Sequence, residues 1–186
     1  MELFEKTLES RIVYKGRVVT LLVDKAELPG GQVCVREVVS HAGAVAIAPL
    51  TPDGSLLFVR QFRYPYKETV LELPAGKLEP GEDPLEAGRR ELLEETGAAA
   101  SSFHSLGIFY PSPGYCAEVI HLYAAEGLSF TQQNLDEDEF LNVEKIPLGR
   151  AMEMVLNNEI PDGKTQTAVL KLCLLLQNGE IGRESV

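Results

Sequence analysis

Residues 76–98, GKLEPGEDPLEAGRRELLEETGA, constrain the fold more than any other stretch, because they mark both ends of one helix. Asp83 suits an N-cap and Pro84 the first helical position, whereas Gly97 suits the left-handed residue that ends a helix. We therefore expect a helix of roughly three and a half turns, entered through a turn at residues 79–81.

The expected helix has two adjoining faces. At about 100° per residue, an apolar stripe that should pack against the protein consists of Leu85, Leu92, Leu93 and Thr96. An acidic arc beside it consists of Glu91, Glu94 and Glu95. Glu91 and Glu95 stand four residues apart, where like charges repel, and no lysine or arginine follows four residues after either. Clustered carboxylates suit Mg²⁺ or Mn²⁺, although a solvated helix face is the alternative.

The spacing of the whole segment favours the metal site over a solvated helix face. Gly76, Glu82 and the run RELLEETGA at 90–98 resemble the Nudix box, the signature of hydrolases that act on nucleoside diphosphates linked to another moiety. This resemblance implies an α/β/α sandwich with a mixed sheet. It also implies direct metal ligation by Glu91 and Glu95, with Glu94 as a further or water-mediated ligand.

Three more residues take their roles from the same resemblance. Arg90 would orient the glutamates by ion pairing, and the backbone carbonyl of Ala75 would be another metal ligand. Glu82 would steady the loop before the helix rather than touch the metal.

Length and composition fit an ordinary globular protein. The 186 residues are 45% hydrophobic, enough for a sizeable core in one domain with an appendage, and the net charge of −11 disfavours general binding to nucleic acid or anionic membranes. The three scattered cysteines and the absence of a basic-then-apolar start in MELFEKTLES predict a reducing cytoplasm. The apolar run at 168–176 is too short to span a bilayer and should be a buried helix.

The pattern along the chain changes near residue 40. Before it, we expect a small antiparallel sheet of strands at 11–14, 18–23 and 32–39, with a turn at 28–31. After it, more continuously apolar strands are expected at 44–50, 56–61, 70–73, 102–110, 119–125 and 139–146, and helices at 148–157 and 165–177. We therefore predict an α/β fold with a β-sheet region at 1–40 and a Nudix hydrolase domain at 41–186.

Arg63 is the expected diphosphate contact. The segment VRQFRYP at 59–65 resembles the one that precedes the box in ADP-ribose pyrophosphatases, where the arginine matching Arg63 binds the diphosphate. For Arg60 we favour a solvated position at the end of a strand.

The loop YPSPGY at 110–115 narrows the expected substrate. Pro113 stands sixteen residues after Gly97, where by resemblance a proline distinguishes the ADP-ribose group, and a stiff loop can shape a ligand pocket. Relatives often have two acidic residues shortly after it, whereas here Ala117 precedes a single candidate, Glu118.

The acidic run DEDE at 136–139 is the expected source of the catalytic base. By resemblance this loop delivers a carboxylate that takes a proton from water, and we assign the role to Glu139 with Glu137 in reserve. An acidic run that is simply solvated loop is the alternative.

Arg36 and Glu37 are the expected adenine contacts. By resemblance such a pair reads the base, often from the partner subunit of a homodimer that exchanges its N-terminal sheets. A cross-strand or solvated pair is equally compatible with the sequence.

These residues together predict Mg²⁺- or Mn²⁺-dependent hydrolysis of ADP-ribose to AMP and ribose 5-phosphate. Two alternatives remain open. One is a Nudix hydrolase acting on another nucleoside diphosphate sugar, a dinucleotide or an oxidised nucleoside triphosphate; the other is a Nudix-like regulator that binds its ligand without catalysis.

Overall fold

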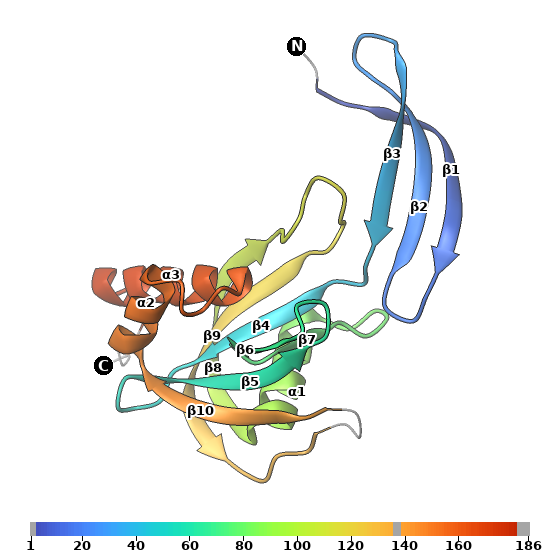
Figure 1. Cartoon of the computed structure of the whole chain (residues 1–186). Coiled ribbons are helices and arrows are strands. Elements are labelled where there is room, and N and C mark those ends of the chain that lie inside the picture. The colour runs from blue at the N-terminus through green and yellow to red at the C-terminus, as the bar shows by residue number, and fades with distance from the viewer. Residues whose placement is uncertain (1–2, 136–138, 182–186) are drawn as a thin grey trace. The chain divides into compact units, whose positions relative to one another are not determined.

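The computed structural model describes residues 3–135 and 139–181, and these ranges form ten strands and three helices (Figure 1). In chain order the elements are β1 (Lys6–Lys15), β2 (Thr20–Glu27), β3 (Val33–Ser40), β4 (Ala44–Pro49), β5 (Ser55–Arg63), β6 (Glu68–Glu72), β7 (Ala75–Lys77), α1 (Pro84–Thr96), β8 (Ala98–Phe109), β9 (Ile120–Phe130), β10 (Leu141–Pro147), α2 (Leu148–Leu156) and α3 (Gly163–Asn178).

The chain divides into two compact units. The N-terminal unit contains the residues up to Gly43 together with Tyr110–Val119, and the main unit contains Ala44–Phe109 and the residues from Ile120 onward. The segment 110–119 is tied to β3 by two backbone hydrogen bonds: Val39 N–H donates to Tyr115 O at 2.8 Å, and Ala117 N–H donates to Val39 O at 2.9 Å. The N-terminal unit thus gains a segment that lies far from β3 in the sequence.

The N-terminal unit is built on an antiparallel sheet in the order β1-β2-β3. β1 and β2 are longer than predicted, because the alternating pattern extends past the most apolar residues, whereas β3 has the predicted length of eight residues. The turn expected at 28–31 is present, with Gly31 at φ 84°, a left-handed conformation that favours glycine.

The main unit contains a sheet in the order β10-β5-β6 and another in the order β7-β4-β9-β8. β4 and β9 are parallel, whereas β4 with β7 and β8 with β9 are antiparallel, so the second sheet is mixed. β7 was missed by the sequence analysis because it is only three residues long and contains Gly76.

β4 is the central strand of a sandwich with helices on both faces. Ala44, Ala46 and Ala48 belong to the core cluster that includes Val169 and Leu172 of α3. Val45 and Ile47 belong to the cluster that includes Ala87 and Leu92 of α1. Since successive strand residues point to opposite faces, α1 and α3 cover opposite sides of β4. The predicted α/β/α sandwich with a mixed sheet is confirmed.

α2 and α3 occupy the ranges where helices were predicted. Asp162 caps α3 by accepting a hydrogen bond from Thr165 N–H at 3.0 Å, and Gly179 ends it at φ 68°. Residues 168–176, expected to form a buried helix, lie within α3, where Ala168, Val169, Leu172 and Cys173 are buried. Within the described residues, no helix is long and apolar enough to cross a membrane.

Candidate metal and diphosphate site

The helix that carries the acidic cluster begins and ends as predicted. Asp83 accepts hydrogen bonds from Leu85 N–H at 2.9 Å and Glu86 N–H at 3.3 Å, with Pro84 at the first helical position. Gly97, at φ 68°, donates its N–H to Leu93 O at 2.8 Å. These local bonds fix where α1 begins and ends.

The face that α1 buries differs from the predicted one. Leu92 and Thr96 are buried as expected, but Leu93 is 39% exposed, whereas Glu91 and Glu95 are only 7% and 2% exposed. Gly88 permits this orientation, because a Cβ there would lie 3.3 Å from Val45 Cγ2 of β4. The helix therefore rests on β4 through Gly88 and brings its glutamates inward, so the predicted packing of Leu93 was wrong.

Gly76 of β7 leaves the space that Glu91 occupies. A Cβ at this position would stand 1.9 Å from Glu91 Cδ and 1.9 Å from Glu91 Oε1. No side chain larger than hydrogen fits without moving the carboxylate. The glycine that opens the box is thus a steric requirement of the acidic site.

Arg90 supplies the positive charge that the spacing of the glutamates demands. Its Nη1 lies 2.7 Å from Glu91 Oε1 and 3.0 Å from Glu94 Oε2. Its Nε and Nη2 each lie 3.0 Å from a carboxylate oxygen of Glu82, which also accepts Glu79 N–H at 2.9 Å. Arg90 therefore contacts three glutamates, two on α1 and one in the preceding loop. Through Glu82, this contact attaches the loop to α1.

Glu95 is the most deeply buried acid of the cluster. Its Oε2 accepts a hydrogen bond from Ala75 N–H at 2.9 Å, which places Ala75 beside it as expected. Burial raises the pKa of Glu95 to about 8, and the negative charges of Glu91 and Glu139 add to the shift. Burial also raises the pKa of Glu91, despite its contact with Arg90.

The donor chemistry fits a hard divalent cation. Within the described residues, no three His, Cys, Asp or Glu side chains are already arranged as a metal cage. Glu91 and Glu95 nevertheless present carboxylate oxygens in a buried setting where, as their raised pKa values indicate, negative charge is costly without a cation. A bound divalent ion would remove that cost.

Of the two candidate bases, Glu139 lies in the described part of the chain and Glu137 lies outside it. Glu139 is half-buried, two residues before β10, and its charge raises the pKa of both Glu91 and Glu95. Glu139 is therefore close to the buried glutamate pair.

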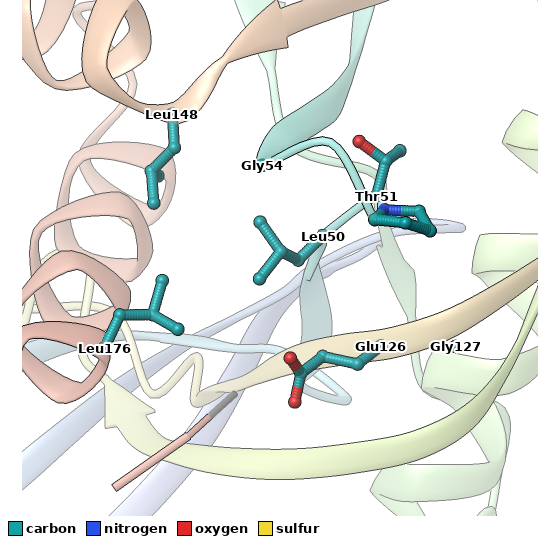
Figure 2. Close-up of a pocket in the computed structure, with 8 residues that line it drawn as sticks. Leu50, Thr51, Gly54, Glu126, Gly127, Leu148 and Leu176 are labelled. Atoms are coloured by element: carbon teal, nitrogen blue, oxygen red, sulfur yellow. The ribbon is translucent and has the colours of Figure 1, made fainter. Parts of the chain in front are cut away.

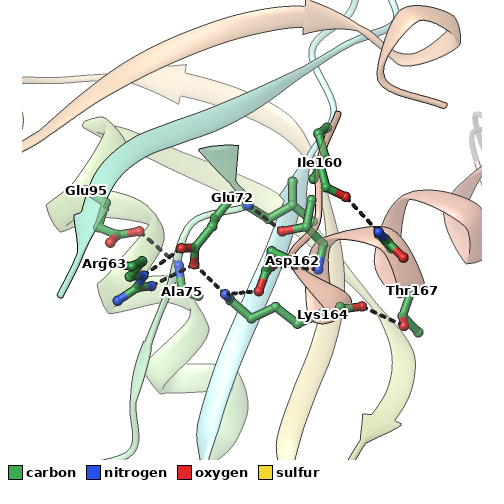
Figure 3. A network of polar contacts seen from close by, with 12 residues as sticks. Arg63, Glu72, Ala75, Glu95, Ile160, Asp162, Lys164 and Thr167 are labelled. Atoms are coloured by element: carbon green, nitrogen blue, oxygen red, sulfur yellow. Dashed lines mark hydrogen bonds and ion pairs between the residues drawn. The ribbon is translucent and has the colours of Figure 1, made fainter. Parts of the chain in front are cut away.

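Arg63 lies in a network of charges that the sequence analysis did not foresee (Figure 3). Its Nε and Nη2 bind Glu72 Oε1 and Oε2 at 2.6 and 2.7 Å, and the Glu72 side chain is 2% exposed. Lys164 Nζ also binds Glu72 and lies 3.0 Å from Asp162 Oδ1. The charge of Arg63 also acts on Glu95, so this network borders the acidic cluster.

Glu72, Asp162 and Lys164 were thus missed as site residues. A signal for Glu72 was present, because it is the single acid in the apolar stretch VLELP that follows Thr69. Lys164 and Asp162 gave no such signal, since only the fold brings the start of α3 to β6. Arg60, by contrast, forms an ion pair with Glu144 across β5 and β10.

Two cavities among the described residues of the main unit bear on the site. One of about 430 Å³ is lined by Arg63, Pro65, Tyr66, Glu68, Val70, Glu72, Pro161, Asp162, Gly163 and Lys164. The other, about 340 Å³, is lined by Leu50, Thr51, Pro52, Gly54, Glu126, Gly127, Leu148 and Leu176 (Figure 2). The second contains none of the predicted site residues.

Four predicted substrate contacts belong to the N-terminal unit. Arg36 donates from Nε and Nη2 to Glu5 at 3.0 and 2.9 Å, and Glu37 follows it on the opposite face of β3. Pro113 is exposed in the turn of the 110–119 segment. Glu118 Oε1 lies 3.5 Å from His41 Nδ1.

Comparisons with known proteins identify relatives of this chain. Residues 40–166 match the NUDIX domain family, and residues 5–39 match the nucleoside diphosphate sugar hydrolase N-terminal domain. The chain is 42% identical over 172 residues to the ADP-ribose pyrophosphatase of Bacillus subtilis (strain 168), covering 91% of this chain and 93% of that protein. It is 44% identical, with the same coverage, to the methanol dehydrogenase activator of Bacillus methanolicus.

The fold also has a counterpart among solved structures. The crystal structure of an ADP compounds hydrolase superposes with a TM-score of 0.84 at 24% identity, covering 96% of this chain and 98% of that one. The NUDIX match spans most of the chain, and the Bacillus subtilis relative aligns over nearly its whole length. The chain therefore belongs to the Nudix family.

Proposed function

We propose that the protein hydrolyses the diphosphate linkage of ADP-ribose to AMP and ribose 5-phosphate. The observation that carries the proposal is the buried pair Glu91 and Glu95, held against Gly76 and Ala75 beside the guanidinium of Arg63. The 42% identity to an ADP-ribose pyrophosphatase over most of both chains supports this substrate.

Family membership implies dependence on a divalent metal, and we propose Mg²⁺ or Mn²⁺. Glu91 and Glu95 would hold it, with Glu94 and the carbonyl of Ala75 as further ligands. A bound divalent cation supplies Lewis-acid neutralisation of the diphosphate charge and lowers the pKa of water.

The chain's own residues supply the rest of the chemistry. Arg63 binds the diphosphate, and Glu72 fixes the guanidinium through Nε and Nη2, leaving Nη1 outside the pair. Glu139, with Glu137 in reserve, takes the proton from the attacking water. Arg90 keeps Glu91 and Glu94 in place through its bonds to both.

The nucleoside end of the substrate is assigned to the N-terminal unit. Arg36 and Glu37 would contact the adenine, while Pro113 and Glu118 would shape the same part of the ligand site. We further propose a homodimer formed through this unit, because its sheet leaves large apolar side chains exposed, among them Ile12 at 58%, Val33 at 61% and Val35 at 61%. The proposed location is the cytoplasm.

The test is a substrate panel with product analysis. ADP-ribose, GDP-mannose and NADH are incubated with the protein and Mg²⁺, and products are separated by chromatography. Hydrolysis should be fastest for ADP-ribose, and its products should be AMP and ribose 5-phosphate. Glu95→Gln should lower turnover by at least ~10², whereas Glu153→Gln on α2 should not change it. Normal turnover by Glu95→Gln would refute the assigned metal ligand.

A second candidate is a regulator that acts on another protein. The relative named methanol dehydrogenase activator is 44% identical over most of the chain, which favours considering this role. The complete set of box glutamates favours catalysis, and nucleotide products in the panel would decide between ligand binding alone and hydrolysis.

A further inference from the structure

Arg63 and Glu72 line a cavity of about 430 Å³, and the other residues of this lining have no role in the chemistry described above. We propose that this cavity receives the terminal sugar of the nucleoside diphosphate sugar, that is, the sugar on the far side of the diphosphate from the nucleoside. This inference rests on the proposed function and deepens it by assigning the residues that select the leaving group.

The floor of the cavity is one face of β6. Glu68, Val70 and Glu72 are spaced two residues apart, so their side chains point to the same side of the strand. Arg63 is the cross-strand partner of Glu68 in the β5–β6 ladder and therefore shares this face. A group attached to a diphosphate held by Arg63 thus has direct access to β6.

The charges of the lining favour a polyol over a second phosphate. Two side chains are cationic, Arg63 and Lys164, and three are anionic, Glu68, Glu72 and Asp162. Both cations contact Glu72, and Lys164 also contacts Asp162, so their charge is largely compensated. Beyond the diphosphate on Arg63, a lining with one more anionic than cationic side chain disfavours a further phosphate, whereas its carboxylates can accept hydrogen bonds from sugar hydroxyls.

The walls of the cavity suit the carbon face of a sugar ring. Pro65 and Tyr66 come from the β5–β6 turn, and Pro161 precedes α3. Their rings add apolar surface to a lining that also carries charged side chains. Such a combination of a few placed polar groups with apolar walls is typical of small-molecule sites.

Glu68 and Tyr66 are the residues on which to test the assignment. Both are exposed, with Tyr66 at 75%, so neither supports the core. Glu68→Gln removes the charge and retains the shape, while Tyr66→Ala removes one wall. Glu153→Gln, on α2 and outside both cavities, is the matched control.

The decisive comparison uses two substrates that differ only in the terminal sugar: ADP-ribose and the methyl ester of ADP. In Glu68→Gln and in Tyr66→Ala, kcat/KM for ADP-ribose should fall about 10-fold relative to the methyl ester, equivalent to about 1.4 kcal/mol. The loss should be mainly in KM, and the control should keep the wild-type ratio. Equal losses for both substrates, or no loss for either, would overturn the sugar assignment.

Binding separates failure of this inference from failure of the proposed function. Calorimetry in Mg²⁺ can measure the affinity for the uncleavable α,β-methylene analogues of the same two compounds. The wild type should bind the sugar-bearing analogue at least about 10-fold more tightly than the methyl ester analogue. Both variants should lose this preference. If hydrolysis is absent but the preference is present, the proposed function fails and the sugar site stands. If the wild type shows no preference, the sugar site is refuted whatever the activity.

Discussion

Gly76 shows how the acidic site depends on a missing side chain. The carboxylate of Glu91 occupies the volume that any Cβ at residue 76 would need. Glu91 is buried and held by Arg90, so it has little freedom to move away. The position of one carboxylate is thus fixed by the strand beside it as well as by its own helix.

Gly76→Ala should therefore displace Glu91 and impair the site. We expect a loss of at least about 10-fold in activity or divalent-cation affinity, as for changes next to metal ligands, and a decrease of about 1–3 kcal/mol in the free energy of unfolding from overpacking. Metal titration and urea unfolding measure the two effects.

Gly149→Ala is the control for this substitution, because nothing lies within 4 Å of a Cβ at that position in α2. It should leave metal affinity unchanged and leave stability equal or slightly higher, since alanine favours the helix. Equal metal affinity in Gly76→Ala and the wild type would show that Glu91 does not need its observed position.

Glu95 makes the stability of the metal-free protein depend on pH. Its folded-state pKa of about 8 lies above the ordinary value of 4.5, so the folded state binds more protons than the unfolded state between these limits. The free energy of unfolding should therefore fall as pH rises from about 4.5 to 8, by up to about 1.4 kcal/mol per pH unit from this group.

The measurement is urea unfolding in EDTA at several pH values, for the wild type and for Glu95→Gln. Glutamine has no charge to bury, so the wild type should lose stability relative to the variant as pH rises. Parallel profiles for the two proteins would show that the pKa of Glu95 is not raised.

At the scale of elements, α3 is attached to the site by Thr165. Its side chain is fully buried, and its Oγ1 accepts a hydrogen bond from Leu73 N–H at 2.9 Å, immediately after β6. The same turn of α3 brings Lys164 to Glu72. One hydrogen bond therefore holds the start of α3 next to the end of β6, the strand that carries Glu72.

Thr165→Val should leave Leu73 N–H buried without an acceptor. The expected cost is about 1–3 kcal/mol in the free energy of unfolding. Thr167→Val is the matched control, because Thr167 Oγ1 donates to Gly163 O within the same helix, and we expect a change within about 0.5 kcal/mol. Chemical unfolding of both variants measures this difference. Equal decreases in the free energy of unfolding would show that the hydrogen bond from Leu73 N–H to Thr165 does not contribute to stability as expected.

Local signals in the sequence were sufficient to predict most elements. The caps of α1 are local, and so are the apolar runs that became β4, β5 and β9. The orientation of α1 was mispredicted because helical periodicity ranks Leu93 above glutamate for burial, whereas the close contact at Gly88 decides which side faces β4. That contact involves two elements and is invisible in either one alone.

The acidic cluster was predictable because its residues are close together in the sequence, whereas the residues of the charged network are not. Glu91, Glu94 and Glu95 share one helix turn, and Arg90 precedes them directly. Glu72 and Lys164 are separated by 92 positions and meet through tertiary structure. The roles assigned to all of these residues remain predictions until the variants are measured.

At the scale of the whole molecule, cation binding should raise stability. A ligand that binds only the folded state at 100 times its Kd adds about 2.7 kcal/mol. For a chain of this length, Tm should rise by about 5–10 °C in saturating Mg²⁺. Scanning calorimetry with and without Mg²⁺ measures the shift, which should vanish in the double variant Glu91→Gln, Glu95→Gln.

The cavity and the acidic cluster draw their residues from different stretches of the chain. The cavity is lined by the β5–β6 hairpin and the start of α3, whereas the acidic residues come from α1 beside β7. Mutations confined to the turn between β5 and β6, such as those at Pro65 and Tyr66, can accumulate without changing Arg63, Glu72 or the carboxylates of α1. Related proteins with this fold could therefore acquire a preference for another terminal sugar through mutations in an exposed turn, while their catalytic residues stay the same.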